Sequence, residues 1–143
     1  MRYFFLFIIV LVFSACEEQN PKLAQQNALE KEVMAIHDSI MPRMGQLKAL
    51  KKAFKDSLAI SAADSTVDNP FETTLQSNLA ALDEADKAMW DWMHNYQAPD
   101  SVQIDANLIY LEEQKKLILE VKEKMESSMT NAQQTLDSLS NIR

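Results

Sequence analysis

The stretch "IDANLIYLEEQKKLILEVKEKM", residues 104–125, decides the fold. Its apolar residues recur at helical spacing, which places them on one face of an α-helix. The stripe continues to about Leu139, and Asp100 followed by Gln103 has the spacing of a capping box. The sequence therefore predicts a helix from Asp100 to about Leu139. The segment "ESSMTN", residues 126–131, contains weak helix formers and marks the place where this helix could break in two.

An equally long helix is expected near the start of the chain, at residues 21–60. Asn20 is a suitable N-cap, and Pro21 follows it at the first helical position, where a missing N–H has no cost. An apolar stripe continues on both sides of Pro42. Because proline removes a backbone hydrogen bond and crowds the preceding turn, we predict a kink at residues 40–45.

A shorter helix is expected between these two. Thr73 followed by Gln76 forms a second capping box, which predicts that this helix begins there. The helix must end near Tyr96, because the residue before Pro99 is disfavoured in a helical conformation. The stretch "ISAADSTVDNPF", residues 60–71, is rich in Ser, Asp and Asn and reads as the loop that connects this helix to the first one.

Glycine is almost absent from the sequence. Gly45 is the only one in 143 residues, and there are four prolines. Hairpin turns, β-bulges and phosphate-binding loops depend on glycine, so sheet folds and glycine-loop nucleotide sites are disfavoured. We predict one all-α domain, residues 21–143, built as an antiparallel three-helix bundle or coiled coil that runs up, down and up. The formal net charge of −7 opposes binding to nucleic acid.

The first residues have the layout of a secretory signal. Arg2 precedes an apolar run, and small residues follow it before Cys16, the only cysteine. The run is too short to cross a bilayer as a helix. The letters "FSAC", residues 13–16, resemble the lipobox of bacterial lipoproteins, which implies cleavage of residues 1–15 and lipidation of Cys16. We expect residues 16–20 to be a short tether and the protein to be anchored to the outer membrane, facing the periplasm or the cell exterior.

Two segments concentrate the unusual residues. We call "VMAIHDSIMPRMG", residues 33–45, the proline segment and "MWDWMHNY", residues 89–96, the tryptophan segment. In an antiparallel pair joined by a loop near residue 66, residues whose numbers sum to about 133 face each other. This register places the two segments at one level of the bundle. It sets Met44 opposite Met89, Met41 opposite Trp92 and Met93, and His37 near His94.

This clustering has two interpretations. Thioether and imidazole ligands suit Cu(I), and the candidate ligands would be Met41, Met44, Met89, Met93, His37 and His94. The interpretation we favour is packing, because methionine fills the irregular gaps that a kinked helix leaves. The histidines would then be half-exposed and bonded to neighbours such as Asp38 or Asp91. Trp90 and Trp92 should point to different faces, so one of them is expected at a groove or a partner surface.

In the proline and tryptophan segments the chain resembles a group of small bacterial lipoproteins usually labelled viral A-type inclusion protein. That label reflects generic coiled-coil similarity, and the resemblance spans most of the chain after the signal. It implies helices, but no activity and no functional residues.

The functional expectation is a non-enzymatic, lipid-anchored helical module that binds a protein partner or a second copy. The sequence has no His-Glu-x-x-His, Cys-x-x-Cys or phosphate-loop motif. The two longer helices were expected to overhang the short one, leaving residues 21–35 and 129–143 free to pair with another chain. The alternatives are Cu(I) handling by the methionine and histidine cluster, and a holdase for apolar segments, which would need an open apolar cleft.

Overall fold

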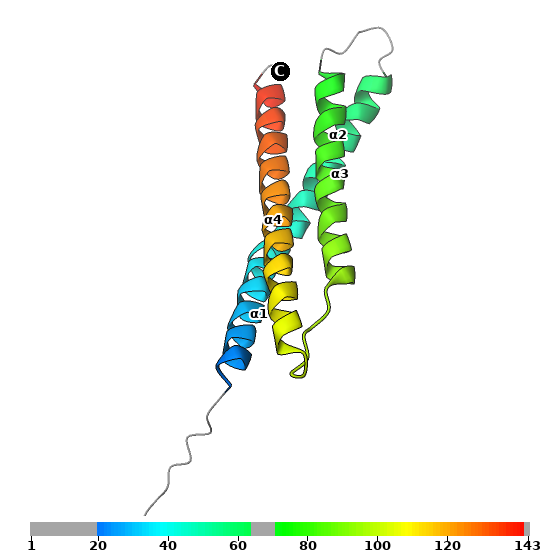
Figure 1. The fold of residues 1–143 in the computed structure, drawn as a ribbon. Coiled ribbons are helices and arrows are strands. Elements are labelled where there is room, and N and C mark those ends of the chain that lie inside the picture. Colours follow the sequence, from blue (N-terminus) through cyan, green and yellow to red (C-terminus); the bar gives the residue numbers. More distant parts are fainter. Residues whose placement is uncertain (1–19, 64–70, 142–143) are drawn as a thin grey trace, which may run out of the picture.

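The structure, a computed structural model, describes residues 20–63 and 71–141. These residues form helices joined by short connections, with no strand in the described ranges. The elements are α1 (Pro21–Ile40), a 3₁₀ turn η1 (Met41–Arg43), α2 (Met44–Ala63), α3 (Glu72–Asn95) and α4 (Ile104–Ser140). Together α1, η1 and α2 form one bent rod that runs in the same direction as α4, while α3 runs against both (Figure 1). The predicted all-α, up-down-up bundle is confirmed.

The bend in the first rod lies where the sequence predicted it. Asn20 caps α1 through its side-chain oxygen, which accepts the Lys22 amide at 3.0 Å. The α-helix then ends at Ile40, and η1 with Pro42 connects it to α2. The bend changes the neighbour of the rod: α1 packs against α4, whereas α2 packs mainly against α3 (Figure 1). The proline therefore decides which helix each half of the rod contacts.

The first rod and α4 lie parallel and in step. Three ion pairs join them, and the partners of each pair are 83 residues apart in sequence. A constant separation is the mark of a parallel register. The pairs are Lys22 with Asp105 at 2.7 Å, Lys115 with Glu32 at 2.6 Å, and Arg43 with Glu126 at 3.3 Å. Because they are exposed or half-exposed, they contribute little to stability and serve mainly to specify the alignment.

The antiparallel register of α2 and α3 also agrees with the prediction. Lys51 of α2 contacts Asp83 and Asp86 of α3, within one turn of the predicted level. The predicted overhangs are confirmed only in part, however. The first turns of α1 extend past the end of α3, as expected (Figure 1), but neither predicted end is free. Residues 21–35 lie beside the first turns of α4, and the last turns of α4 lie beside α3, where Asn78 Nδ2 donates to Thr135 Oγ1 at 3.3 Å. Because α4 spans the whole length of the bundle, it covers both ends.

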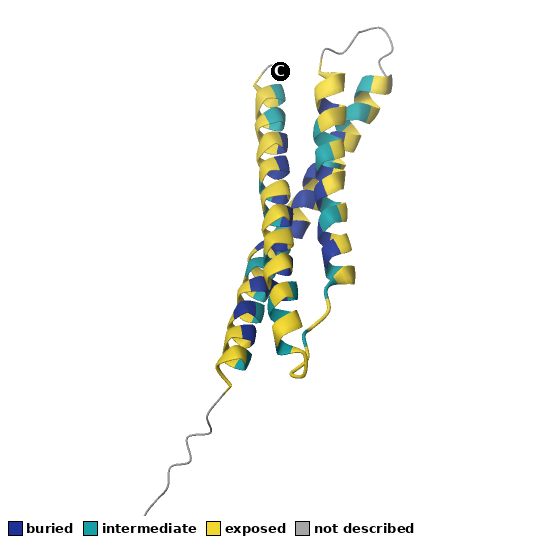
Figure 2. Ribbon diagram, viewed as in Figure 1, coloured by how far each residue is buried: buried dark blue, intermediate teal, exposed yellow. Residues whose placement is uncertain are grey.

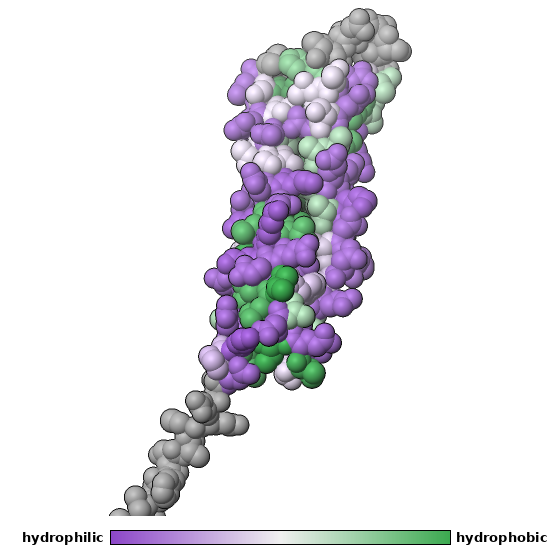
Figure 3. All heavy atoms as spheres, in the orientation of Figure 1, coloured by the Kyte–Doolittle hydropathy of each residue, from purple (hydrophilic) through white to green (hydrophobic). Residues whose placement is uncertain are grey.

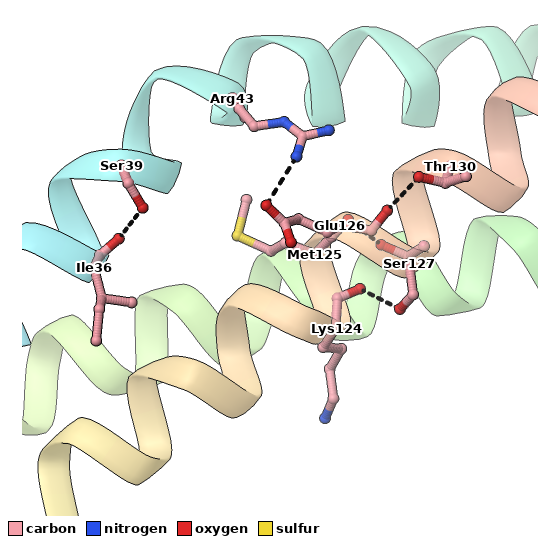
Figure 4. A network of polar contacts seen from close by, with 9 residues as sticks. Ile36, Ser39, Arg43, Lys124, Met125, Glu126, Ser127 and Thr130 are labelled. Atoms are coloured by element: carbon pink, nitrogen blue, oxygen red, sulfur yellow. Dashed lines mark hydrogen bonds and ion pairs between the residues drawn. The ribbon is translucent and has the colours of Figure 1, made fainter.

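The possible break at residues 126–131 is also wrong, because α4 continues through them. The hydroxyls of Ser127 and Thr130 donate to carbonyl oxygens of the preceding turn, at 3.2 Å and 2.8 Å, so they do not compete with the helix (Figure 4). Ser128 does the same at 3.1 Å, and Met129 is buried in the core. Tertiary packing thus outweighs the weak helix propensity of this segment.

Two helix starts differ from the predicted capping boxes. Helix α3 begins at Glu72, so Thr73 lies inside its first turn, and Gln76 Nε2 donates to Glu72 Oε1 at 3.0 Å instead of reaching back to a cap. Its predicted end near Tyr96 is confirmed.

At α4 the predicted hydrogen bond exists, since Asp100 Oδ1 accepts the Gln103 amide at 3.1 Å, but the helix begins later, at Ile104. Backbone amides of Gln103 and Val102 and the Asn107 side chain hold the pKa of Asp100 below its usual value. Asp100 therefore organises the turn before α4 and is not its first residue.

The core is a continuous stripe along the inward faces of the helices (Figure 2). It includes residues from all four α-helices, among them Val33, Leu47, Phe54, Leu82, Met89, Leu111, Ile118 and Met125, each at most 1% exposed. Gln26 is also buried but fully bonded: its amide donates to the Asp100 carbonyl at 2.9 Å and accepts from Asn107 at 3.3 Å. In the described part of the chain, no helix has the length and apolar character needed to span a bilayer.

Candidate functional site

An aromatic cluster forms where the proline and tryptophan segments meet. The ring of His37, near the end of α1, stacks on Trp92 of α3, with centroids 5.4 Å apart. Trp92 also contacts Tyr96 at 5.0 Å, and Tyr96 contacts Tyr110 of α4 at 6.3 Å. The prediction that these two segments lie at one level of the bundle is therefore confirmed.

The two tryptophans differ as their spacing predicted. Trp92 is 7% exposed and belongs to the core, whereas Trp90 is 44% exposed. Residues two positions apart on a helix point to nearly opposite sides, so α3 can bury only one of them against its neighbours. Trp90 is accordingly the surface tryptophan of the pair, and Trp92 is the one that packs.

The two histidines contact different tryptophans. His37 Nδ1 donates to Asp38 Oδ1 at 2.9 Å, as predicted, while its ring lies on Trp92. The His94 ring instead lies 5.9 Å from Trp90, and its Nδ1 donates to the Trp90 carbonyl at 2.7 Å, not to Asp91. The two imidazoles therefore contact different tryptophans of the tryptophan segment, and no direct contact between them is found among the described residues.

The methionines of the two segments share the core. Met44 and Met89 are buried in it, and Met41 and Met93 pack against its edge. They are joined there by Met125 and Met129 of α4, which the sequence analysis did not single out. Across the described ranges there is no group of three or more His, Cys, Asp or Glu residues with metal-site geometry. That finding does not bear on a thioether site, but the burial of Met44 and Met89 supports the packing interpretation.

Two buried polar atoms beside this cluster have no hydrogen-bond partner, namely Trp92 Nε1 and the Tyr96 hydroxyl. Burial, with smaller contributions from Glu30 and Tyr110, raises the pKa of Tyr96 to about 12. A buried donor without an acceptor costs free energy, so such groups are uncommon in native proteins. The packing at the C-terminal end of α3 is therefore not optimised for stability alone.

A groove runs between α3 and α4 next to Trp92. Its volume is about 310 Å³, and both walls come from well-packed helices. This groove was not predicted from the sequence. The available signal was Gln114, a polar residue at an inward position of an otherwise apolar stripe, between Leu111 and Ile118. Such a residue indicates either a buried polar contact or a site that a ligand completes.

Large apolar side chains are also exposed near the start of α4. Val102, Ile109, Leu117 and Leu119, which we call the apolar set, are all more than one-third exposed. The space-filling view shows hydrophobic atoms among hydrophilic ones on this half of the visible face (Figure 3). Single exposed apolar residues are ordinary. Leu117 and Leu119 are two positions apart and point to nearly opposite sides of α4, with Leu117 at the groove beside α3. Ile109 and Leu119 lie about 80° apart around the helix and are the two that can share one contact surface.

The predicted signal, residues 1–15, and the predicted lipidation site, Cys16, lie outside the described residues. The chain matches no protein-family model, no curated protein and no solved structure. Its function must therefore be inferred from its own residues.

Proposed function

We propose that this protein is a non-enzymatic lipoprotein of the cell envelope, anchored through Cys16, whose helical bundle binds a protein partner or a second copy. The observation that carries the proposal is the apolar set: Ile109 is 74% exposed and Leu119 45% exposed on a helix that otherwise separates polar from apolar faces. Burying such side chains in an interface gains free energy in proportion to the apolar area removed from water. The signal-like start of the chain supports the envelope location.

The end of the bundle near the tether supports this arrangement. Asn20, the first described residue, lies at the same end as the start of α4 (Figure 1). With a lipidated Cys16 only a few residues before it, this end and Val102 would lie close to the membrane. The rest of α4 would extend away from the lipid, where Ile109 and Leu119 can meet a neighbouring protein.

The test is crosslinking in cells followed by membrane fractionation. The wild-type chain should sediment with membranes and form a discrete crosslinked species. Cys16→Ala should move the protein to the soluble fraction, because a lipid anchor supplies the membrane affinity. Ile109→Ser with Leu119→Ser should abolish the crosslink but leave the anchoring unchanged. The matched control is Ile60→Ser, which alters an equally exposed apolar residue at the far end of α2. A chain that stays soluble, or that yields no crosslinked species, would end the proposal.

Cu(I) handling is the second candidate, favoured by one observation: Met44 and Met89 belong to the core, and Met41 and Met93 pack against it. If the site exists, the purified chain should compete with a colorimetric Cu(I) chelator under reducing conditions. Met41→Leu with Met44→Leu should then lose at least tenfold in affinity, since leucine keeps the apolar volume but cannot coordinate. Equal competition by the wild type and the double variant would exclude this role. A holdase would need an open apolar cleft. The groove beside Trp92, of about 310 Å³, holds a small molecule and not a polypeptide segment. A larger hollow on α4, of about 870 Å³, is lined by charged and polar residues with Leu119 as its one apolar member, so that alternative gains no support.

A further inference from the structure

We propose that the groove between α3 and α4 binds a small amphipathic carboxylate. Its apolar wall comprises Leu117 and Val121 of α4 with Ala88 of α3. Such a wall can pack against a short hydrocarbon chain of a ligand. The groove volume of about 310 Å³ falls at the lower end of the range for small-molecule sites. At a share of roughly 30 Å³ per water molecule, it has room for about ten non-hydrogen atoms.

The polar side of the groove offers donors that no described residue uses. Trp92 is 7% exposed, and its Nε1–H has no acceptor. Gln114 is 9% exposed and lines the same groove, and its side-chain amide has no hydrogen bond to the described part of the chain. Two oxygens of one carboxylate could accept from both groups. Trp92 Nε1 has almost no exposed surface, so an oxygen can reach it only if a side chain of the groove moves. We infer that Gln114 moves, because its side chain has no hydrogen bond to the described part of the chain.

The charges on the rim favour an anion. Asp91 is paired with Lys87, and Glu120 lies 3.9 Å from Lys116, so both carboxylates of the rim have a lysine partner. Lys124 also lines the groove and forms no ion pair with any described residue. Of the three charged residues at the rim, Lys124 is therefore the one without an oppositely charged partner among the described residues. The Lys124 ammonium would attract a carboxylate bound in the groove. It would repel the ammonium group of an amine with the same chain length.

The probe is octanoate, which has about ten non-hydrogen atoms, as the groove volume suggests. The full chain, labelled with ¹⁵N, is titrated with octanoate while the indole N–H signals are followed by NMR. The Trp92 signal should shift saturably, in the direction of a stronger hydrogen bond, with a dissociation constant of about a millimolar or tighter. The Trp90 signal, from the opposite side of α3, should not move. Octylammonium should bind at least fivefold more weakly.

Matched variants separate the groove from general surface binding. Gln114→Leu should weaken octanoate binding at least fivefold, and Lys124→Gln about two- to threefold. Gln133→Leu makes the same substitution on an exposed turn of α4 and should have no effect. If Gln114→Leu loses its helical circular dichroism, Leu117→Phe, which fills the groove from a partly exposed position, replaces it and should also weaken binding fivefold. An unmoved Trp92 signal, equal binding of octylammonium, or unchanged affinity in the folded groove variants would overturn the proposal.

Discussion

Replacing Phe54 with alanine is expected to lower the free energy of unfolding by about 3–5 kcal/mol. Phe54 of α2 is the largest side chain with no exposed surface, and it packs in the core shared by the helices. Its loss removes the transfer free energy of the ring and leaves a cavity that rigid helices cannot fully close. Small domains have a total stability of roughly 5–15 kcal/mol, so the variant should be only marginally folded. Urea denaturation followed by circular dichroism measures the difference.

Ile60→Ala on the same helix is the matched control for this prediction. Ile60 is 65% exposed, so its truncation should change the free energy of unfolding by about 0.5 kcal/mol or less. Both changes shorten an apolar side chain on α2, and both replace it with a good helix former. If the two variants were equally stable, Phe54 would not occupy the core position described above.

The second large effect is expected at Lys51, which joins α2 to α3. Its Nζ lies 2.8 Å from Asp83 Oδ1 and 2.5 Å from Asp86 Oδ2, and the side chains of Lys51 and Asp86 are each only 17% exposed. The second oxygen of Asp86 is buried without a partner. Lys51→Met would leave two neighbouring carboxylates with no cation, one of them largely buried. We expect a loss of about 2–3 kcal/mol at neutral pH, below the full cost of breaking a deeply buried pair because Asp83 is half-exposed.

Lys52→Met is the control, since Lys52 pairs with Asp56 at 2.5 Å but both side chains are mostly exposed. Exposed pairs of this kind contribute about 0.3–0.5 kcal/mol, so the change should be near that value. A comparable loss in both variants would show that the Lys51 cluster has no special role in holding α2 to α3.

The Lys51 cluster also predicts a pH dependence. Burial lowers the pKa of Lys51, but hydrogen bonds to Asp83 and Asp86 outweigh it, and the net pKa lies above the usual 10.5. A raised pKa means that the folded state binds the proton more tightly than the unfolded state. The stabilisation is therefore complete below about pH 10, the range of an unfolded lysine, and is lost as the pH rises through the folded pKa. The stability difference between wild type and Lys51→Met should shrink at alkaline pH, and a constant difference would contradict this assignment.

Features that depend on local chain chemistry could be predicted from the sequence. Pro42 has no amide hydrogen and a fixed ring wherever it stands in a helix, so the bend at residues 40–45 followed from its position alone. The N-cap at Asn20 is equally local. The meeting of the proline and tryptophan segments followed from loop length and antiparallel geometry, which require only that neighbouring helices share a register. The exact pairing did not, because the register set Met41 opposite Trp92, whereas His37 is the residue that stacks on it.

Other features depended on which helix lies next to which. Residues 126–131 remain helical because Met129 is buried, although their propensity is weak. The groove beside Trp92 exists because α3 and α4 approach each other with Gln114 between them, and no single segment carries a signal for that space.

The sequence by itself determined the helices, the bend and the separation of the two tryptophans, because helical period and proline chemistry act within a few residues. Only the tertiary structure decided that α1 packs mainly against α4, that His37 and His94 contact different tryptophans, and that Trp92 keeps an indole N–H without an acceptor among the described residues. These outcomes depend on how distant residues pack. Packing depends on the shape and volume of every neighbour at once, which a residue pattern does not record.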